Sequence, residues 1–561
     1  MSARPALSNA EIADRLTSLS QILTTQKENF FKIKAYRRAA QTIRTLSESI
    51  DELVRSEADL TAYPGIGKAI GGAIREIVLS GTLGQLDVLR SQISPQLAAL
   101  NEYPHLDPQR VLRIYRKLGI STVGELKQKL ASGEVAASLG ARMDQHVRQA
   151  LSETRQILLR AAHPVAAAVE KFLVNQCGVT RAEASGDFRR RVEVIGEISF
   201  LIDTDDFPSV VSKLERYGGK AELLSSAANE AVFKLPSGIT LRIETATAGK
   251  WGVAWIAATG SREHLRKLAG ACDLLGIAGS DDGFPTESAV YRQLGLSFIE
   301  PELREGGDEV DLARQGRLPS LVSLSHIRGE LHAHSTSSDG ANSIAEMAAG
   351  ARARGYEYLG ITDHSQSLKI ARGLSEGELW QQIRFIDKLN ESMDGFRTLK
   401  SAEVDILADG TLDYPDVLLR ELDYTVCSIH SQFQLPKAAQ TSRMMRAMDN
   451  RYCTIVGHAA GRLLLRRPGY EVDIGRVIEH AKKNGCFFEI NSNPNRLDLS
   501  AANARLARDA GLRLAISTDA HSIREFDFIG GGIEQARRAG LQKDQILNCL
   551  SWPELSRIFR R

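Results

Sequence analysis

Histidines and carboxylates gather in the C-terminal part of this chain in a pattern that could bind metal ions. Eight of the twelve histidines lie after residue 325, and six of these follow short apolar segments typical of strands. Three acidic residues stand in the same positions. The nine candidate metal ligands are His332, His334, Asp339, His364, Glu403, His430, His458, Asp519 and His521. In His332-Ala-His334 both imidazoles point the same way, because side chains along a strand repeat with a period of two.

This ligand set predicts the hydrolysis of phosphoesters. Mixed imidazole and carboxylate ligands suit manganese, zinc or iron better than magnesium or calcium. Nine ligands exceed the needs of one ion, so we expect two or three divalent ions, with manganese or zinc favoured. Such ions lower the pKa of bound water, and a pair about 3.5–4 Å apart stabilises both oxygens of a phosphoryl transfer. Arg462 and Arg496 are candidate catalytic residues that could hold substrate phosphate, although structural ion pairs would explain them equally well.

Seven predicted strands must position these ligands. They alternate with helices or long loops and span residues 329–334, 358–362, 399–404, 424–429, 454–457, 487–491 and 512–517. This alternation predicts a layered or barrel-shaped α/β domain. Ligands at the C-terminal ends of successive strands are the active-site geometry of a β/α barrel.

A second motif lies near the N-terminus, in a region with helical patterning. Residues 63–70 read Y-P-G-I-G-K-A-I and run into a helix. A tight turn formed by Gly65 and Gly67 leaves backbone N–H groups free to grip a phosphate, and Lys68 follows directly. This is the pattern of a helix-hairpin-helix motif, which holds the DNA backbone without reading bases. The alternative is a plain corner between two helices.

Positive charge accompanies this motif. A basic helix predicted at residues 27–40 carries Lys34 and Arg37, which we take as further DNA contacts. Residues 1–200 hold 27 basic and 21 acidic side chains, while the whole chain holds 71 and 69. An excess of positive charge at this end suits a polyanionic partner, although ordinary surface variation would also produce it.

The motifs together resemble a known family. The segments G-E-L-H-A-H-S-T-S-S-D-G, I-T-D-H-S, A-E-V-D-I-L, C-S-I-H-S, G-H-A-A-G-R, E-I-N-S-N-P-N-R-L-D-L and S-T-D-A-H-S are similar to the PHP (polymerase and histidinol phosphatase) domain. More narrowly, they resemble the PHP domain that is fused to bacterial X-family DNA polymerases. All nine ligand positions match. One departure is Ala459-Ala460, where the family commonly has Pro-Thr.

The resemblance implies a multidomain α/β architecture with four domains. These are a helix-hairpin-helix DNA-binding domain at 1–90, a helical fingers-like domain at 91–160, a polymerase-X-like α+β palm and thumb at 161–318, and a PHP barrel at 326–561. The barrel would be a distorted (β/α)7 type with a trinuclear manganese or zinc site. The activity implied there is 3′–5′ exonuclease and related phosphoester cleavage at DNA ends and abasic sites.

The polymerase resemblance fails at its active site. Family members hold two magnesium ions with three aspartates, and this chain has Glu197, Ser199 and Thr240 at those positions. Asp203 lies about 20 Å from Glu197 along the strand, and Glu244 about 13 Å from Thr240, at roughly 3.3 Å per residue. Neither acid can share an ion with Glu197. We therefore expect a degenerate polymerase site on a scaffold that still holds DNA or merely keeps the fold.

Composition fits this interpretation. The chain has 561 residues, of which 43% are hydrophobic and 25% charged, as in globular proteins. No apolar run approaches the roughly 18 residues of a membrane span, and the N-terminus lacks the apolar core of a signal peptide. The six cysteines are scattered, which favours reduced thiols. We expect a cytoplasmic monomer that acts on gapped, nicked or 3′-ended DNA.

The sequence therefore predicts a DNA-repair enzyme that processes DNA ends through a metal-dependent phosphoesterase. Three alternatives remain at this stage. One is an active X-family repair polymerase with a PHP exonuclease. Another is a small-molecule phosphatase of the histidinol-phosphate type. The third is a DNA-end-binding scaffold whose metal cluster is only structural.

Overall fold

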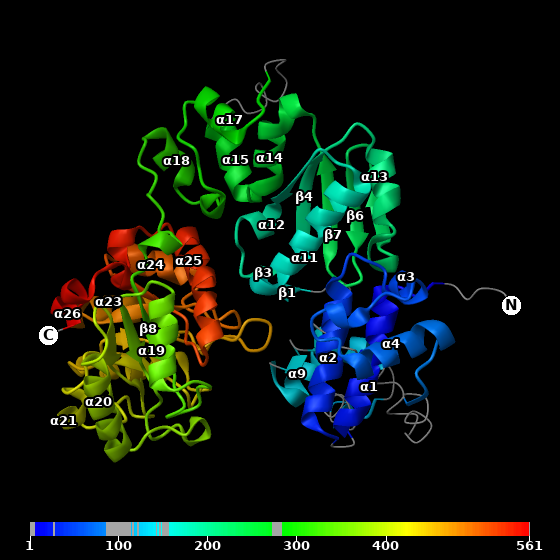
Figure 1. The fold of residues 1–561 in the computed structure, drawn as a ribbon. Coiled ribbons are helices and arrows are strands. Elements are labelled where there is room, and N and C mark those ends of the chain that lie inside the picture. The colour runs from blue at the N-terminus through cyan, green and yellow to red at the C-terminus, as the bar shows by residue number, and fades with distance from the viewer. Residues whose placement is uncertain are drawn as a thin grey trace. The chain divides into compact units, whose positions relative to one another are not determined.

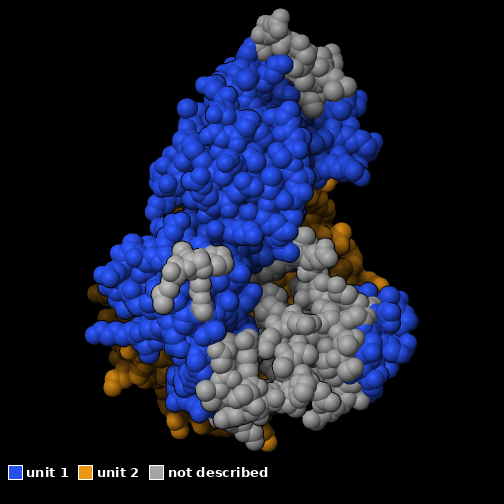
Figure 2. Space-filling view, turned by 90° about the vertical axis from the view of Figure 1, so that its right-hand side faces the viewer, with its two compact units in different colours: residues 1–298 blue, residues 299–561 orange. Residues whose placement is uncertain are grey.

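The fold comes from a computed structural model. It describes residues 6–25, 28–85, 114, 117–120, 123–141, 143–144, 147–148, 156–271 and 283–559. The chain divides into two compact units, residues 1–298 and 299–561 (Figure 2). Most of the predicted domain at 91–160 lies outside the described residues. Within the described part of the chain, no helix is long and apolar enough to cross a membrane.

The first unit begins with a small helical bundle. Its elements are α1 (Asn9–Thr25), α2 (Phe30–Thr45), α3 (Ile50–Arg55), the 3-10 turn η1 (Leu60–Ala62) and α4 (Lys68–Ser80). Apolar residues of α1 at helical spacing, such as Ile12, Leu16 and Leu19, are fully buried in the bundle core. Asn29 caps α2, and Gly81 ends α4 in the left-handed conformation.

A five-stranded mixed sheet forms the middle of the chain, in the order β2-β4-β7-β6-β5. Its strands are β2 (Arg181–Ser185), β4 (Glu197–Asp203), β5 (Glu222–Ser226), β6 (Glu230–Lys234) and β7 (Thr240–Thr245). β4 and β7 are parallel neighbours, and β6 and β7 form an antiparallel hairpin. A separate pair joins β1 (Ile157–Leu158) to β3 (Val194–Ile195). The apolar run at 192–202 forms two strands, β3 and β4, on either side of Gly196.

Helices surround this sheet (Figure 1). They are α11 (Leu159–Phe172), the π turn η3 (Leu173–Cys177), α12 (Gly186–Arg189), α13 (Phe207–Leu214), η4 (Tyr217–Gly219), η5 (Ala248–Lys250), α14 (Trp251–Thr259), α15 (Arg262–Ala271) and α17 (Glu287–Gln293). Before the sheet, the structure also describes α8 (Val123–Ala131) and α9 (Glu134–Leu139). Buried residues of α11 and α13 share one core with the sheet.

The second unit is built on parallel strands. They are β8 (Gly329–Ala333), β9 (Tyr358–Ile361), β10 (Arg397–Lys400), β11 (Glu403–Asp405), β12 (Val426–Ser428), β13 (Ile455–Val456), β14 (Phe487–Asn491) and β15 (Leu514–Ser517). They form one sheet in the order β10-β9-β8 and another in the order β11-β12-β13-β14-β15. The isolated bridges Ala333↔Ala520 and His364↔Glu403 join the two sheets at both edges. The result is the predicted distorted barrel.

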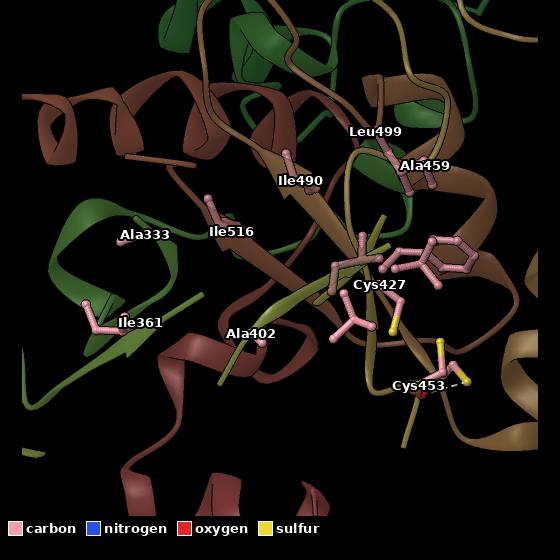
Figure 3. Packing of buried hydrophobic residues seen from close by; sticks show 14 of the residues in the cluster. Ala333, Ile361, Ala402, Cys427, Cys453, Ala459, Ile490, Leu499 and Ile516 are labelled. Atoms are coloured by element: carbon pink, nitrogen blue, oxygen red, sulfur yellow. Dashed lines mark hydrogen bonds between the residues drawn. The ribbon is translucent and has the colours of Figure 1, made fainter. Parts of the chain in front are cut away.

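The barrel has eight strands, one more than predicted, because the predicted strand at 399–404 is broken at Ser401–Ala402 into β10 and β11. The strands β8, β9 and β15 are buried along their whole length, as expected for parallel strands covered on both faces. Figure 3 shows Ile490 of β14 and Ile516 of β15 in the core that these strands share with the helices.

Most helices of the second unit cover the barrel (Figure 1). They are α18 (Glu309–Arg314), α19 (Ile344–Ala353), α20 (Glu376–Asn390), α21 (Asp416–Leu419), α22 (Lys437–Asp449), α23 (Ile474–Asn484), α24 (Ala501–Asp509), α25 (Ile529–Arg538) and α26 (Trp552–Phe559). Short turns are η6 (Pro301–Leu303), η7 (Leu324–His326), η8 (Lys369–Ala371), η9 (Ile523–Phe528), η10 (Lys543–Gln545) and η11 (Leu547–Cys549). Sequence explains the ends of α23, where Asp473 caps the first turn and left-handed Gly485 stops the helix.

Candidate functional site

The structure brings all nine predicted ligands together at the C-terminal ends of the barrel strands. Eight of them form three adjoining groups, in each of which the candidate ligand atoms lie within 4.8 Å of one another. The groups are His334, Asp339, His364 and His521; His332, His334 and Asp519; and His364, Glu403 and His430. The ninth, His458, lies beside them, with its Nε2 3.0 Å from Oε1 of Glu403. His334 and His364 each belong to two groups, so the groups form one continuous cluster.

Buried atoms without hydrogen-bond partners show that this cluster fits metal ions. Nε2 of His332, both ring nitrogens of His334 and Oε2 of Glu403 are buried and make no hydrogen bond within the described part of the chain. The Glu403 oxygen stands 3.4 Å from His332 Nε2 and 3.6 Å from His334 Nε2. Leaving a buried polar atom unsatisfied costs about 1–3 kcal/mol. Several divalent cations among these donors would remove that cost.

Electrostatics within the cluster differ from ring to ring. Burial, reinforced by the neighbouring ring of His364, lowers the pKa of His334 to about 4. Burial also disfavours a charged His430, but the carboxylates of Glu403 and Asp405 outweigh it and raise the pKa of His430 to about 9. The lowered pKa of His334 favours the neutral ring that a metal ligand requires.

Two buried carboxylates behind the ligands were not predicted from the sequence. Glu489 of β14 accepts hydrogen bonds from His332 Nδ1 at 2.6 Å and from Ser517 Oγ at 2.6 Å. Asp405 of β11 lies 2.5 Å from Nδ1 of His430. Such partners fix the ring orientation and direct Nε2 toward the metal. The available signals were a second acid two residues after Glu403, in A-E-V-D, and an acid inside an apolar predicted strand, in E-I-N.

Backbone geometry is unusual at two ligands. His458 and Asp519 have φ of +26° and +54°, a region that residues other than glycine seldom adopt. Each such conformation costs of order 1–3 kcal/mol and persists only where the surroundings enforce it. Directly before His458, a Cβ on Gly457 would lie 2.4 Å from Ser428 Oγ, so only glycine fits there. The fold thus holds these ligands in place against a local energetic cost.

The two candidate arginines take different positions. The guanidinium Nε of Arg496 lies 3.4 Å from Oδ2 of Asp519, so Arg496 reaches the cluster. Arg462 donates a hydrogen bond from Nη2 to the carbonyl of Leu497 and connects the loops that follow β13 and β14. Arg496 is therefore better placed than Arg462 to meet a phosphate at the cluster.

The N-terminal candidates lie on two elements of the helical bundle, the turn before α4 and the helix α2. Gly65 has φ of +84°, and Gly67 caps α4 without a side-chain hydrogen bond. Lys68 begins α4 and lines a cavity of about 760 Å³ beside this turn. Lys34 and Arg37 of α2 are exposed. The first backbone N–H groups of α4 are thus left without a side-chain cap, and DNA contact by these residues stays a prediction.

The three positions that the resemblance matches to polymerase aspartates also come together. Glu197 of β4 pairs directly with Thr240 of β7, and Ser199 pairs with Arg242. Arg242 donates to both carboxylate oxygens of Glu197, from Nε at 2.9 Å and from Nη2 at 3.2 Å, and forms a second ion pair with Glu230. Ser199 Oγ donates to Glu197 at 3.1 Å. The one carboxylate retained at these positions is therefore bound to an arginine of the same sheet.

Two domain families of known proteins match this chain. The helix-hairpin-helix domain family matches residues 7–83, and the PHP domain family matches residues 330–493. The chain thus combines a helix-hairpin-helix region, a mixed-sheet middle and a parallel PHP barrel, as the sequence predicts.

A relative of full length then gives the family. The DNA polymerase/3′-5′ exonuclease PolX of Bacillus subtilis (strain 168) is 32% identical over 578 residues, covering 98% of this chain and 99% of the relative. The chain belongs to the PolX family. Its C-terminal part is also similar to smaller proteins. A probable phosphatase of Thermoanaerobacter sp. (strain X514) is 29% identical over 39% of this chain and 89% of that protein. Another, from Acetivibrio thermocellus, is 30% identical over 34% and 78%.

Proposed function

We propose that this chain is a metal-dependent nuclease that removes nucleotides from DNA 3′ ends, and that its palm does not polymerise DNA. The observation that carries the proposal is the continuous cluster of three ligand groups in the barrel. The full-length similarity to an enzyme named for 3′-5′ exonuclease activity supports DNA as the substrate.

The nine ligands would hold two or three divalent ions, and manganese or zinc would suit these ligands best. Bound there, the ions supply an activated water and stabilise charge on a phosphate in transfer. Arg496 positions the phosphate, and Arg462 holds the loop beside it. Gly65, Gly67 and Lys68 hold the DNA backbone, with Lys34 and Arg37 adding positive charge. The monomer expected from the sequence stays a prediction.

The palm lacks the means to bind two magnesium ions. Ser199 and Thr240 carry no carboxylate, and Arg242 already neutralises Glu197. A divalent cation would have to displace this guanidinium and would gain only one carboxylate in return. Asp187 forms an ion pair with Arg190 in the segment that resembles the family's nucleotide-binding motif. In these contacts, arginines of the same chain pair with the carboxylates of Glu197 and Asp187. They support a palm that does not polymerise DNA.

The four-domain division stays part of the proposal. The boundary between the two compact units, at residues 298–299, falls inside the proposed palm and thumb at 161–318. The segment after it packs on the PHP barrel, because Arg537 of α25 donates to Glu302 at 2.7 Å and Arg538 pairs with Glu305 at 3.1 Å. These ion pairs explain why the end of the proposed thumb joins the second unit.

A comparison of substrates tests the nuclease. The full chain is incubated with Mn²⁺ and a 5′-labelled oligonucleotide, in parallel with a chromogenic phosphate monoester. We expect a ladder of products shortened from the 3′ end, and no ladder with His334→Ala. Turnover of the monoester without shortening of DNA would instead identify a small-molecule phosphatase. If neither substrate gives a product, the remaining interpretation is a DNA-binding scaffold whose metal cluster is only structural.

A further inference from the structure

The loop that follows β9 presents one isoleucine almost entirely to solvent. Ile370 is 94% exposed, more than any other large hydrophobic side chain of the described residues. Its neighbours Lys369 and Arg372 are exposed as well, whereas Ala371 is buried. An isoleucine normally gains stability by leaving water. Its full exposure between two cations therefore needs a reason.

The base of this loop is fixed to the metal centre. Leu374 N donates to the carbonyl of His364 at 2.8 Å, so the loop starts and ends at a candidate ligand. A Cβ on Gly373 would lie 1.8 Å from the backbone oxygen of Ser365, so only glycine lets the two ends of the loop come this close. Ile370 thus projects from the same barrel end as the ligands.

Further contacts hold the loop rigid. Ser367 donates from its backbone N to Asp413 Oδ2 at 2.7 Å and from Oγ to Asp405 Oδ2 at 2.6 Å. Asp405 also contacts His430, so the loop shares a partner with a second ligand. Arg372 has φ of +56°, a conformation that a non-glycine residue adopts only when its surroundings enforce it. An exposed apolar tip on a rigid loop is suited to insertion into a partner.

We propose that Ile370 is a wedge that separates the last base pair of a DNA duplex, so that the 3′ strand can enter the metal centre. Apolar side chains of this size unstack base steps in DNA-bending proteins. Lys369 and Arg372 would contact the phosphates on either side of the separated step. A protein partner fits less well, because lysine is depleted in the centres of protein interfaces. This proposal rests on the nuclease function proposed above.

The test compares the rates at which the full chain, supplied with Mn²⁺, shortens two kinds of DNA end. One 5′-labelled strand has its 3′ end paired to a template, and the other ends in several unpaired nucleotides. We expect Ile370→Ala to lower the ratio of the paired-end rate to the unpaired-end rate about tenfold. Ile370→Met should restore the ratio, because it keeps an apolar side chain of similar size. Leu506→Ala, at an exposed apolar residue of α24, serves as the matched control.

If Ile370→Ala shortens both ends at wild-type rates, the wedge is overturned and the nuclease stays intact. Equal losses on both ends would also overturn it, since they would indicate a general defect at the loop. If the wild-type chain shortens neither strand, the proposed nuclease function fails, and the wedge with it.

Discussion

At the scale of single residues, the carboxylates behind the metal ligands decide how the rings point. Glu489 binds His332 Nδ1, Ser517 Oγ and the backbone N of His458. We predict that Glu489→Gln weakens metal binding about 10–100-fold, as loss of such supporting partners commonly does. Titration of Mn²⁺ or Zn²⁺ into the metal-free protein, followed by calorimetry, measures the change.

Glu479→Gln is the matched control, because Glu479 is an exposed glutamate of α23 on the neighbouring helix. It should bind metal as tightly as wild type. Equal affinities for Glu489→Gln and Glu479→Gln would show that Glu489 does not orient the site.

In the proposed inactive palm, Arg242 takes the place of metal ions beside Glu197. Arg242→Met leaves Glu197 and Glu230 without their common partner. All three side chains are about a third exposed, so solvent screening limits the loss of unfolding free energy to about 1 kcal/mol or less. Urea unfolding followed by circular dichroism measures this loss. We expect no primer extension by the variant, since two carboxylates are still missing. Extension would mean that the ion pair alone had silenced the polymerase.

At the scale of elements, we expect the turn before α4 to present the N-terminal end of this helix to DNA. We predict that Lys68→Ala weakens DNA binding to a similar degree for every sequence and lowers the slope of log affinity against log salt by about 1. Fluorescence anisotropy at several salt concentrations measures both quantities. Lys482→Ala, at an exposed lysine of α23, is the control and should keep the wild-type slope. Weakening confined to one DNA sequence would argue for base reading instead.

The strand ends of the barrel could be predicted from sequence, but several contacts between elements could not. Apolar runs followed by histidine or acid located every candidate ligand, because strand period and burial are local properties. The break between β10 and β11 depends on the two sheets meeting at His364 and Glu403, far apart in the chain. The partner of Glu197 depends on the register of β4 with β7, which sets Arg242 opposite Ser199. The sequence predicts that only one of three carboxylates remains in the palm, but it does not show which residue neutralises Glu197.

At the scale of the whole molecule, the proposed hydrolytic site and the proposed DNA-binding turn belong to different compact units. We therefore predict that a chelator stops DNA shortening but leaves DNA binding nearly unchanged, since the turn at Gly65 and Gly67 uses backbone N–H groups rather than an ion. A gel assay and anisotropy on the same sample measure the two effects. Loss of DNA binding on chelation would place the main DNA contacts at the metal centre.

One experiment tests the division of labour between barrel and palm most directly. A 5′-labelled primer on a gapped template is incubated with the full chain, Mn²⁺ and all four deoxynucleoside triphosphates, beside His334→Ala. A metal-dependent nuclease with a neutralised palm shortens the primer, and His334→Ala leaves it at its original length. Extension of the primer would contradict this, because it would require a working metal site at Glu197, Ser199 and Thr240.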